Sequence, residues 1–189
     1  MAGRYLLFAF YGVSGAGKTI VLNTTQQIGS DVKLHIKDST KVLGDGEPRP
    51  TDLRLISNEE FNACQAQNDY ELTYQKYGAR YAIVRQQLLD AFTKKEAHCV
   101  IIRDITALET FVRSYPHTKT VYFHVDPAVV RDRLAERGEK RVKERLQRID
   151  QEYKEFIENN TLFDHIVLNA WSVDDAVRQL QRIIADYRR

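Results

Sequence analysis

The stretch Gly12-Val13-Ser14-Gly15-Ala16-Gly17-Lys18-Thr19 decides the fold of this chain. It reads G-x-x-x-x-G-K-[ST], the phosphate-binding P-loop. An apolar run at residues 5–10 precedes it and Ile20-Val21-Leu22 follows, which supplies the strand–loop–helix context that the motif requires. Glycines with positive φ let successive N–H groups line one concavity, and a helix N-terminus adds positive charge there. We therefore expect these residues to bind nucleotide phosphates, with Lys18 on the β- and γ-phosphates and Thr19 on Mg²⁺.

Length and composition indicate one globular domain without a marked charge bias. The chain has 189 residues, 43% hydrophobic and 29% charged, with a formal net charge of +2. This balance argues against a nucleic-acid or membrane partner. Cys64 and Cys99 are too few and too far apart for a metal site or a disulfide framework, which favours a reducing, cytoplasmic location. The first apolar run leads straight into the P-loop, so we expect a buried strand there rather than a secretion signal.

Apolar runs alternate with helical patterns, which predicts an α/β fold with a parallel sheet flanked by helices. The predicted core strands are residues 5–10, 33–36, 99–102, 120–125 and 165–168. The predicted helices are residues 18–28, 83–97, 142–157 and 172–187, with two more starting at a capping box, Ser57–Glu60, and at Asp126-Pro127.

Two segments interrupt this alternation. Residues 37–83 contain a Gly-, Pro- and charge-rich stretch and three short strand patterns, at 53–56, 70–74 and 80–83. We interpret them as an inserted acceptor-binding subdomain over the phosphate site. Residues 131–145 join two helices through Gly138 and predict a helical lid. The core would then comprise residues 1–36, 84–130 and 146–189.

The P-loop leaves a switch GTPase, a motor-type ATPase and a small-molecule kinase as alternatives. The D-x-x-G and N/T-K-x-D patterns of GTPases do not occur in the sequence. A kinase needs cations over the transferred phosphoryl group, and the lid supplies Arg133, Arg137 and Arg145 for this catalytic role. We interpret the remaining cations nearby as a solvated helix face: Arg131, Lys140, Lys143 and Arg148.

Several residues are candidates for the acceptor side. Asp104 ends the apolar run Val100-Ile101-Ile102 and is expected to face the P-loop Mg²⁺ or the acceptor. Tyrosines of the insert either line a pocket or only pack, Ser39 either binds substrate or shapes a turn, and Glu71 either reads a base edge or is exposed. The tyrosines concerned are Tyr70, Tyr74, Tyr77 and Tyr81.

The order of P-loop, insert, acid-tipped strand and arginine lid resembles guanylate kinases. The segments Leu55–Phe61, Gly78–Tyr81 and Phe163–Asn169 are similar to that family's F-V-S-x-E-E-F, G-N-Y-Y and F-D-Y-V-V-V-N. The resemblance implies ATP as donor, Mg²⁺ as cofactor, an adenine contact near Asn169 and a guanine contact at Asp104. It also implies that Lys41 and Arg49 stand in for the two arginines that hold the acceptor phosphate.

A sister family, the ribose 1,5-bisphosphate phosphokinases, is similar over residues 71–82, with matches at Thr73, Gly78, Arg80 and Tyr81. The acceptor-binding residues that we expect are Ser39, Lys41, Arg49, Glu71, Tyr74, Arg80, Tyr81 and Asp104. The prediction is a monomeric or homodimeric kinase with a small phosphorylated acceptor such as GMP. The alternatives are a sugar-phosphate kinase, a non-catalytic interaction module and a kinase of nucleic-acid ends.

Overall fold

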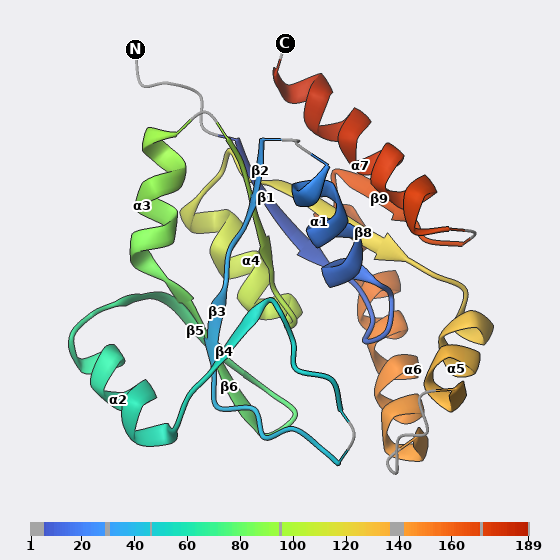
Figure 1. The fold of residues 1–189 in the computed structure, drawn as a ribbon, viewed down its shortest axis with the longest axis horizontal. Helices are drawn as coiled ribbons and strands as arrows, with labels where there is room; N and C mark the ends of the chain where they lie inside the picture. Colours follow the sequence, from blue (N-terminus) through green and yellow to red (C-terminus); the bar gives the residue numbers. More distant parts are fainter. Residues whose placement is uncertain are drawn as a thin grey trace.

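The computed structural model describes residues 6–28, 31–45, 47–94, 96–136, 142–170 and 172–188, and for residues 133–136 and 142–145 it describes the backbone. Helices and strands alternate along most of the chain (Figure 1). In chain order they are β1 Leu6–Tyr11, α1 Lys18–Gln27, β2 Val32–Leu34, β3 Lys37–Ser39, β4 Leu53–Leu55, α2 Asn58–Ala66, β5 Tyr70–Lys76, β6 Ala79–Val84, α3 Arg85–Thr93, β7 Ala97–Ile101, α4 Ile105–Ser114, β8 Lys119–His124, α5 Pro127–Glu136, α6 Val142–Glu158, the 3₁₀ turn η1 Asn160–Leu162, β9 His165–Leu168 and α7 Val173–Arg188.

The main sheet is parallel and has β1 at its centre. Its five strands run in the order β2-β7-β1-β8-β9, and each pairing is parallel. The predicted α/β class and the five predicted core strands are therefore confirmed. The chain moves from β1 to one side of the sheet and later to the other, which creates a crevice at the carboxyl end of β1. The P-loop lies at this end.

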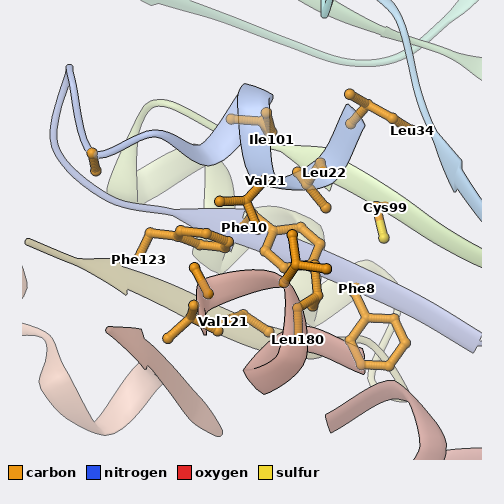
Figure 2. Close-up of a cluster of buried hydrophobic side chains, with 14 of the residues drawn as sticks. Phe8, Phe10, Val21, Leu22, Leu34, Cys99, Ile101, Val121, Phe123 and Leu180 are labelled. Atoms are coloured by element: carbon orange, nitrogen blue, oxygen red, sulfur yellow. The ribbon is translucent and has the colours of Figure 1, made fainter. Parts of the chain in front are cut away.

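Both faces of the main sheet are buried, because successive side chains of each strand point to opposite faces. On one face Phe8 and Phe10 of β1 pack with residues of α1 and α7, among them Val21 and Leu180 (Figure 2). On the other face the neighbours Leu7 and Ala9 pack against α3, α4 and the second sheet.

The second sheet has four strands in the order β4-β3-β6-β5, all from the segment after β2. β3 pairs in parallel with β4 and antiparallel with β6, and β5–β6 is a hairpin whose turn is Tyr77-Gly78. Figure 1 places this sheet and α2 beside the carboxyl end of the main sheet. Across the described ranges, no helix is both long and apolar enough to cross a bilayer.

The structure corrects three details of the sequence interpretation. α3 is Arg85–Thr93 rather than residues 83–97, because Ile83 pairs with Leu72 in the hairpin and Ala97 pairs with Leu6 in the main sheet. The predicted strand 33–36 extends too far, because β2 ends at Leu34 and residues 35–36 connect it to β3, which belongs to the other sheet. The helix α4 was not predicted. The capping box is confirmed, since the Ser57 hydroxyl accepts a hydrogen bond from the Glu60 N–H.

Candidate functional site

The loop between β1 and α1 depends on two glycines. Gly12 has φ 150°, and a Cβ there would lie 2.6 Å from the Phe123 carbonyl oxygen. Gly17 has φ 84°, and its Cβ would lie 2.3 Å from Nδ2 of Asn169. Asn169 is buried and donates a hydrogen bond from Nδ2 to the Ala16 carbonyl, at 2.8 Å. The loop is therefore packed tightly against β8 and against the residue that follows β9.

Lys18 is held inside this loop. Its Nζ donates to the carbonyl oxygens of Gly12, at 2.6 Å, and Val13, at 2.9 Å. Burial, and after it the nearby charge of Arg103, lowers the pKa of the Lys18 ammonium to about 8. An anion beside Lys18 would raise the pKa of its ammonium again and stabilise the charged form, so the site suits a negatively charged ligand.

A carboxylate of α6 contacts the P-loop. Glu152 of α6 accepts a hydrogen bond from the Ser14 N–H at 2.7 Å and one from the Tyr77 hydroxyl at 3.0 Å. The Glu152 side chain is almost fully buried. Its carboxylate stands in for the kind of anionic oxygen that a P-loop binds. The contact connects the P-loop, α6 and the β5–β6 turn.

Asp52 lies between the P-loop helix and two cations. Its carboxylate accepts from the Thr19 hydroxyl at 3.4 Å and from Nη2 of Arg103 at 2.9 Å, and it lies 3.6 Å from Nζ of Lys37. Burial alone would raise the pKa of Asp52, but Arg103 and Lys37 hold it well below its usual range. Burial lowers the pKa of Lys37 to about 7, against the opposing effect of Asp52. A hydroxyl beside an ionised carboxylate is a donor set that fits Mg²⁺, which prefers oxygen ligands and retains several waters.

Asp104 lies at the start of α4. Its carboxylate caps α4 by accepting from the Ala107 N–H at 2.9 Å, and it is 3.8 Å from Nζ of Lys76. Lys76 also contacts both carboxylate oxygens of Glu155, at 3.1 Å each. The carboxylate that contacts Thr19 is therefore that of Asp52, and the predicted metal and acceptor roles of Asp104 stay predictions.

A cavity of about 580 Å³ opens over the P-loop. The P-loop, the loop after β3, the β5–β6 turn, the end of β7 and α6 line it. Five cationic side chains are among the lining residues: Lys18, Lys41, Lys76, Arg103 and Arg148. Three acidic residues also line it, Asp45, Glu47 and Glu152, so the cations outnumber the acids and the cavity is suited to phosphate groups.

Some of the predicted acceptor residues border this cavity. Lys41 and Tyr81 line it, and Nζ of Lys41 forms an ion pair with Glu47. The Tyr81 ring stacks on that of Tyr74, with centroids 5.2 Å apart. The Tyr74 hydroxyl accepts a hydrogen bond from the backbone N–H of Arg103, at 3.2 Å.

Other predicted acceptor residues point elsewhere. Arg80 donates to Asn62 and Gln65, at 2.7 Å each, because adjacent residues of β6 point to opposite faces and Tyr81 takes the cavity side. Three more of the predicted residues, Ser39, Glu71 and Arg49, are not part of the cavity lining. Ser39 is buried and donates to the Arg80 carbonyl, Glu71 lies 3.5 Å from Arg85, and Arg49 is exposed.

The predicted lid arginines fall outside the description: Arg137 itself, and the side chains of Arg133 and Arg145. Arg148 corrects the sequence interpretation. The sequence pattern predicts a solvated helix face for Arg148. In the structure Arg148 lines the cavity, with its guanidinium carbon 4.6 Å from the centre of the Tyr77 ring. One turn of α6 is enough to bring Arg148 and Glu152 to the same side.

Sequence reasoning missed three residues of the site: Arg103 and Glu152, which line the cavity, and Asp52, which binds Arg103. Asp52 is followed by an alternating strand pattern and Glu152 lies within a run of charged helix residues, so neither carries a distinctive signal. Arg103 offered one, because it directly follows a buried strand next to the P-loop strand, where parallel sheets present ligand-binding side chains.

A P-loop with an internal lysine, below a cationic cavity at the carboxyl end of a parallel sheet, defines the class of P-loop phosphotransferases. The guanylate kinase family model matches residues 7–187, and the chain belongs to this family.

Known proteins resemble the chain over nearly its full length. The guanylate kinase of Thermotoga maritima is 24% identical over 185 residues, which cover 96% of this chain and 87% of that protein. The crystal structure of guanylate kinase from Anaplasma phagocytophilum superposes with a TM-score of 0.74 at 16% identity, covering 100% of this chain and 89% of that one. An uncharacterised protein from Eubacterium ventriosum gives 0.51 at 14% identity, over 95% and 98% of the two chains. These structural matches support the fold.

Proposed function

We propose that this chain is a Mg²⁺-dependent cytoplasmic kinase that transfers the γ-phosphoryl group of ATP directly to a small phosphorylated acceptor. The observation that carries the proposal is the cavity, which joins the P-loop to a wall of the insert and is lined by cations from both. Family membership supports phosphoryl transfer, and the intact P-loop with its buried Lys18 argues against a non-catalytic interaction module.

On the donor side, the P-loop N–H groups and Lys18 bind the phosphates, and Asn169 holds the loop in place. Mg²⁺ supplies charge neutralisation on the β- and γ-phosphate oxygens. Thr19 would hold it, and we assign Asp52 as the carboxylate that orients Thr19. Arg133, Arg137 and Arg145 are proposed to close over the transferred group. Closure would exclude water and so prevent unproductive hydrolysis.

On the acceptor side, GMP is the first candidate because of the family. One observation favours a second candidate, a sugar phosphate without a base. Glu71 and Asp104 are the two carboxylates proposed to read guanine, and neither lines the cavity.

A coupled ADP-release screen tests the proposal and separates the candidates. It compares GMP, dGMP, the other nucleoside monophosphates and ribose 1,5-bisphosphate at equal concentration. Turnover with GMP and dGMP selects the guanine nucleotide, and turnover with the sugar bisphosphate alone selects the second candidate. Silence with every phosphorylated acceptor would refute the proposed function.

The Lys18→Ala variant checks that turnover comes from the P-loop. Loss of a charged phosphate contact predicts a decrease of about tenfold or more in kcat/KM. The matched control is Lys154→Ala, which removes an exposed lysine of α6 that pairs with Glu158 at 3.7 Å. Equal activity of Lys18→Ala and wild type would contradict the assignment.

A further inference from the structure

Arg103 occupies the junction between the donor and acceptor sides of the cavity. It follows β7, the strand next to the P-loop strand, and it lines the cavity. Its backbone N–H is fixed by Tyr74, and its guanidinium carbon lies 5.9 Å from the centre of the Tyr81 ring. Both tyrosines belong to the β5–β6 hairpin. Arg103 is therefore a core arginine that contacts the insert.

Asp52 holds one end of the Arg103 guanidinium and leaves the rest accessible. Nη2 donates to Asp52 at 2.9 Å, while 28% of the Arg103 side chain remains exposed. Nε is buried without a hydrogen-bond partner. A guanidinium carries five N–H donors in a planar fork that matches the oxygens of a phosphate. The anchored end restricts the rotamers of the side chain, so less conformational entropy is lost when a phosphate binds.

The charges around Arg103 favour an anion. Lys37 and Arg103 share one carboxylate, since Asp52 lies 3.6 Å from Nζ of Lys37 and 2.9 Å from Nη2 of Arg103. Two cations therefore have one counter-charge between them beside the cavity. A second phosphate group beside Arg103 would balance the remaining positive charge.

The cations expected on the acceptor side are otherwise engaged. Arg80 is bound to α2, Lys41 is paired with Glu47, and Arg49 is outside the cavity lining. A phosphorylated acceptor therefore needs a cation from another element. Of the remaining lining cations, Lys76 contacts Glu155 and Arg148 lies over the Tyr77 ring, whereas Arg103 is held at one end by Asp52 and has 28% of its side chain exposed.

We propose that Arg103, oriented by Asp52, binds the phosphate of the acceptor next to the P-loop. The inference rests on the proposed function and deepens it, because it names the residue that binds the phosphate group of the acceptor. It also moves acceptor recognition from the loop after β3 to the end of β7.

The experiment uses inorganic phosphate as the probe, with the P-loop filled. The protein is saturated with Mg²⁺ and a non-hydrolysable ATP analogue, and phosphate is titrated by ³¹P NMR or calorimetry. We expect wild type to bind phosphate, and Arg103→Ala to weaken phosphate binding about tenfold or more. Arg103→Lys retains the charge but loses the fork, so we expect an intermediate loss of several-fold.

Two arginine controls separate Arg103 from general charge effects. Arg113→Ala removes an exposed arginine of α4, and we expect phosphate binding to change less than about twofold. Arg80→Ala tests the arginine that the sequence suggested, and the same small change is expected. Binding of the ATP analogue to every variant, within about threefold of wild type, shows that each variant is folded and that the donor site is intact.

The outcomes distinguish this inference from the proposed function. Failure of wild type to bind the ATP analogue refutes the proposed function and the inference with it. Binding of the analogue without binding of phosphate refutes the inference alone. So does phosphate binding that is unchanged in Arg103→Ala and Arg103→Lys, or that is lost in Arg80→Ala instead.

Discussion

Replacing Glu152 by glutamine should make the P-loop a better nucleotide site. The carboxylate accepts from the Ser14 N–H at 2.7 Å, so a triphosphate that uses this N–H must first displace it. Glu152→Gln keeps the size of the side chain and its ability to accept a hydrogen bond, and it removes the charge. The substitution thus isolates the electrostatic part of the competition.

The expected gain follows from the strength of that bond. A hydrogen bond to a charged group contributes about 1.5–3 kcal/mol, against about 1 kcal/mol between neutral groups. Removing the charge should therefore stabilise the nucleotide complex by about 0.5–2 kcal/mol, which tightens Kd about 2- to 30-fold. Repulsion between a carboxylate and the phosphates acts in the same direction.

Calorimetric titration with Mg²⁺ and a non-hydrolysable ATP analogue measures this change. The matched control is Glu155→Gln, which removes the same charge one turn further along α6, where the carboxylate accepts from Tyr11 at 2.6 Å and contacts Lys76. The control should stay within about twofold of wild type. Equal or weaker nucleotide binding by Glu152→Gln, or the same gain in the control, would refute the reasoning.

Three further predictions concern stability. Gly17→Ala should lower both stability and nucleotide affinity more than Gly78→Ala, since both glycines have positive φ but only Gly17 would meet another side chain, Asn169, within 3 Å; equal losses on chemical denaturation would contradict a packing role for Asn169. Burial, and then the charge of His98, lowers the pKa of His35 to about 3. The effect of His35 on the free energy of unfolding should therefore be absent above pH 6.5. Between pH 6.5 and about 3 it should lower that free energy by about 1.4 kcal/mol per pH unit, because the unfolded chain takes up the proton and the folded chain does not. His35→Leu should reduce this slope in urea titrations at pH 7 and pH 5. Leu180→Ala should reduce the free energy of unfolding by about 2–5 kcal/mol, because Leu180 is fully buried against the main sheet, and a loss below 1 kcal/mol would be inconsistent with that packing.

Local patterns account for what the sequence predicted well. The P-loop requires a short contiguous stretch with glycines at set positions, and the two flanking elements are its immediate neighbours. The three central strands, β7, β1 and β8, are largely apolar because both faces of the main sheet are covered there, so each appears as a nearly continuous run. The same reasoning failed for α4, whose capping residue Asp104 was interpreted as an acid at the tip of a strand.

The acceptor side was harder to predict. Successive side chains of a strand point to opposite faces of the sheet, but the sequence does not show which of the two faces borders the cavity. Arg80 and Tyr81 are neighbours in β6, and only the packing of the hairpin on the core decides that Tyr81 faces the cavity. Likewise Arg148 reads as a surface residue until α6 is placed against the β5–β6 turn.

The sequence by itself determined the phosphate-binding loop, the parallel sheet behind it and the family, because these depend on residues that are close together along the chain. Only the tertiary structure decided which charges meet at the loop. Ser14 and Glu152 are separated by 138 positions, and Asp52 and Arg103 by 51. Contacts across such distances depend on how helices and sheets pack, and the pattern of neighbouring residues carries no record of that packing.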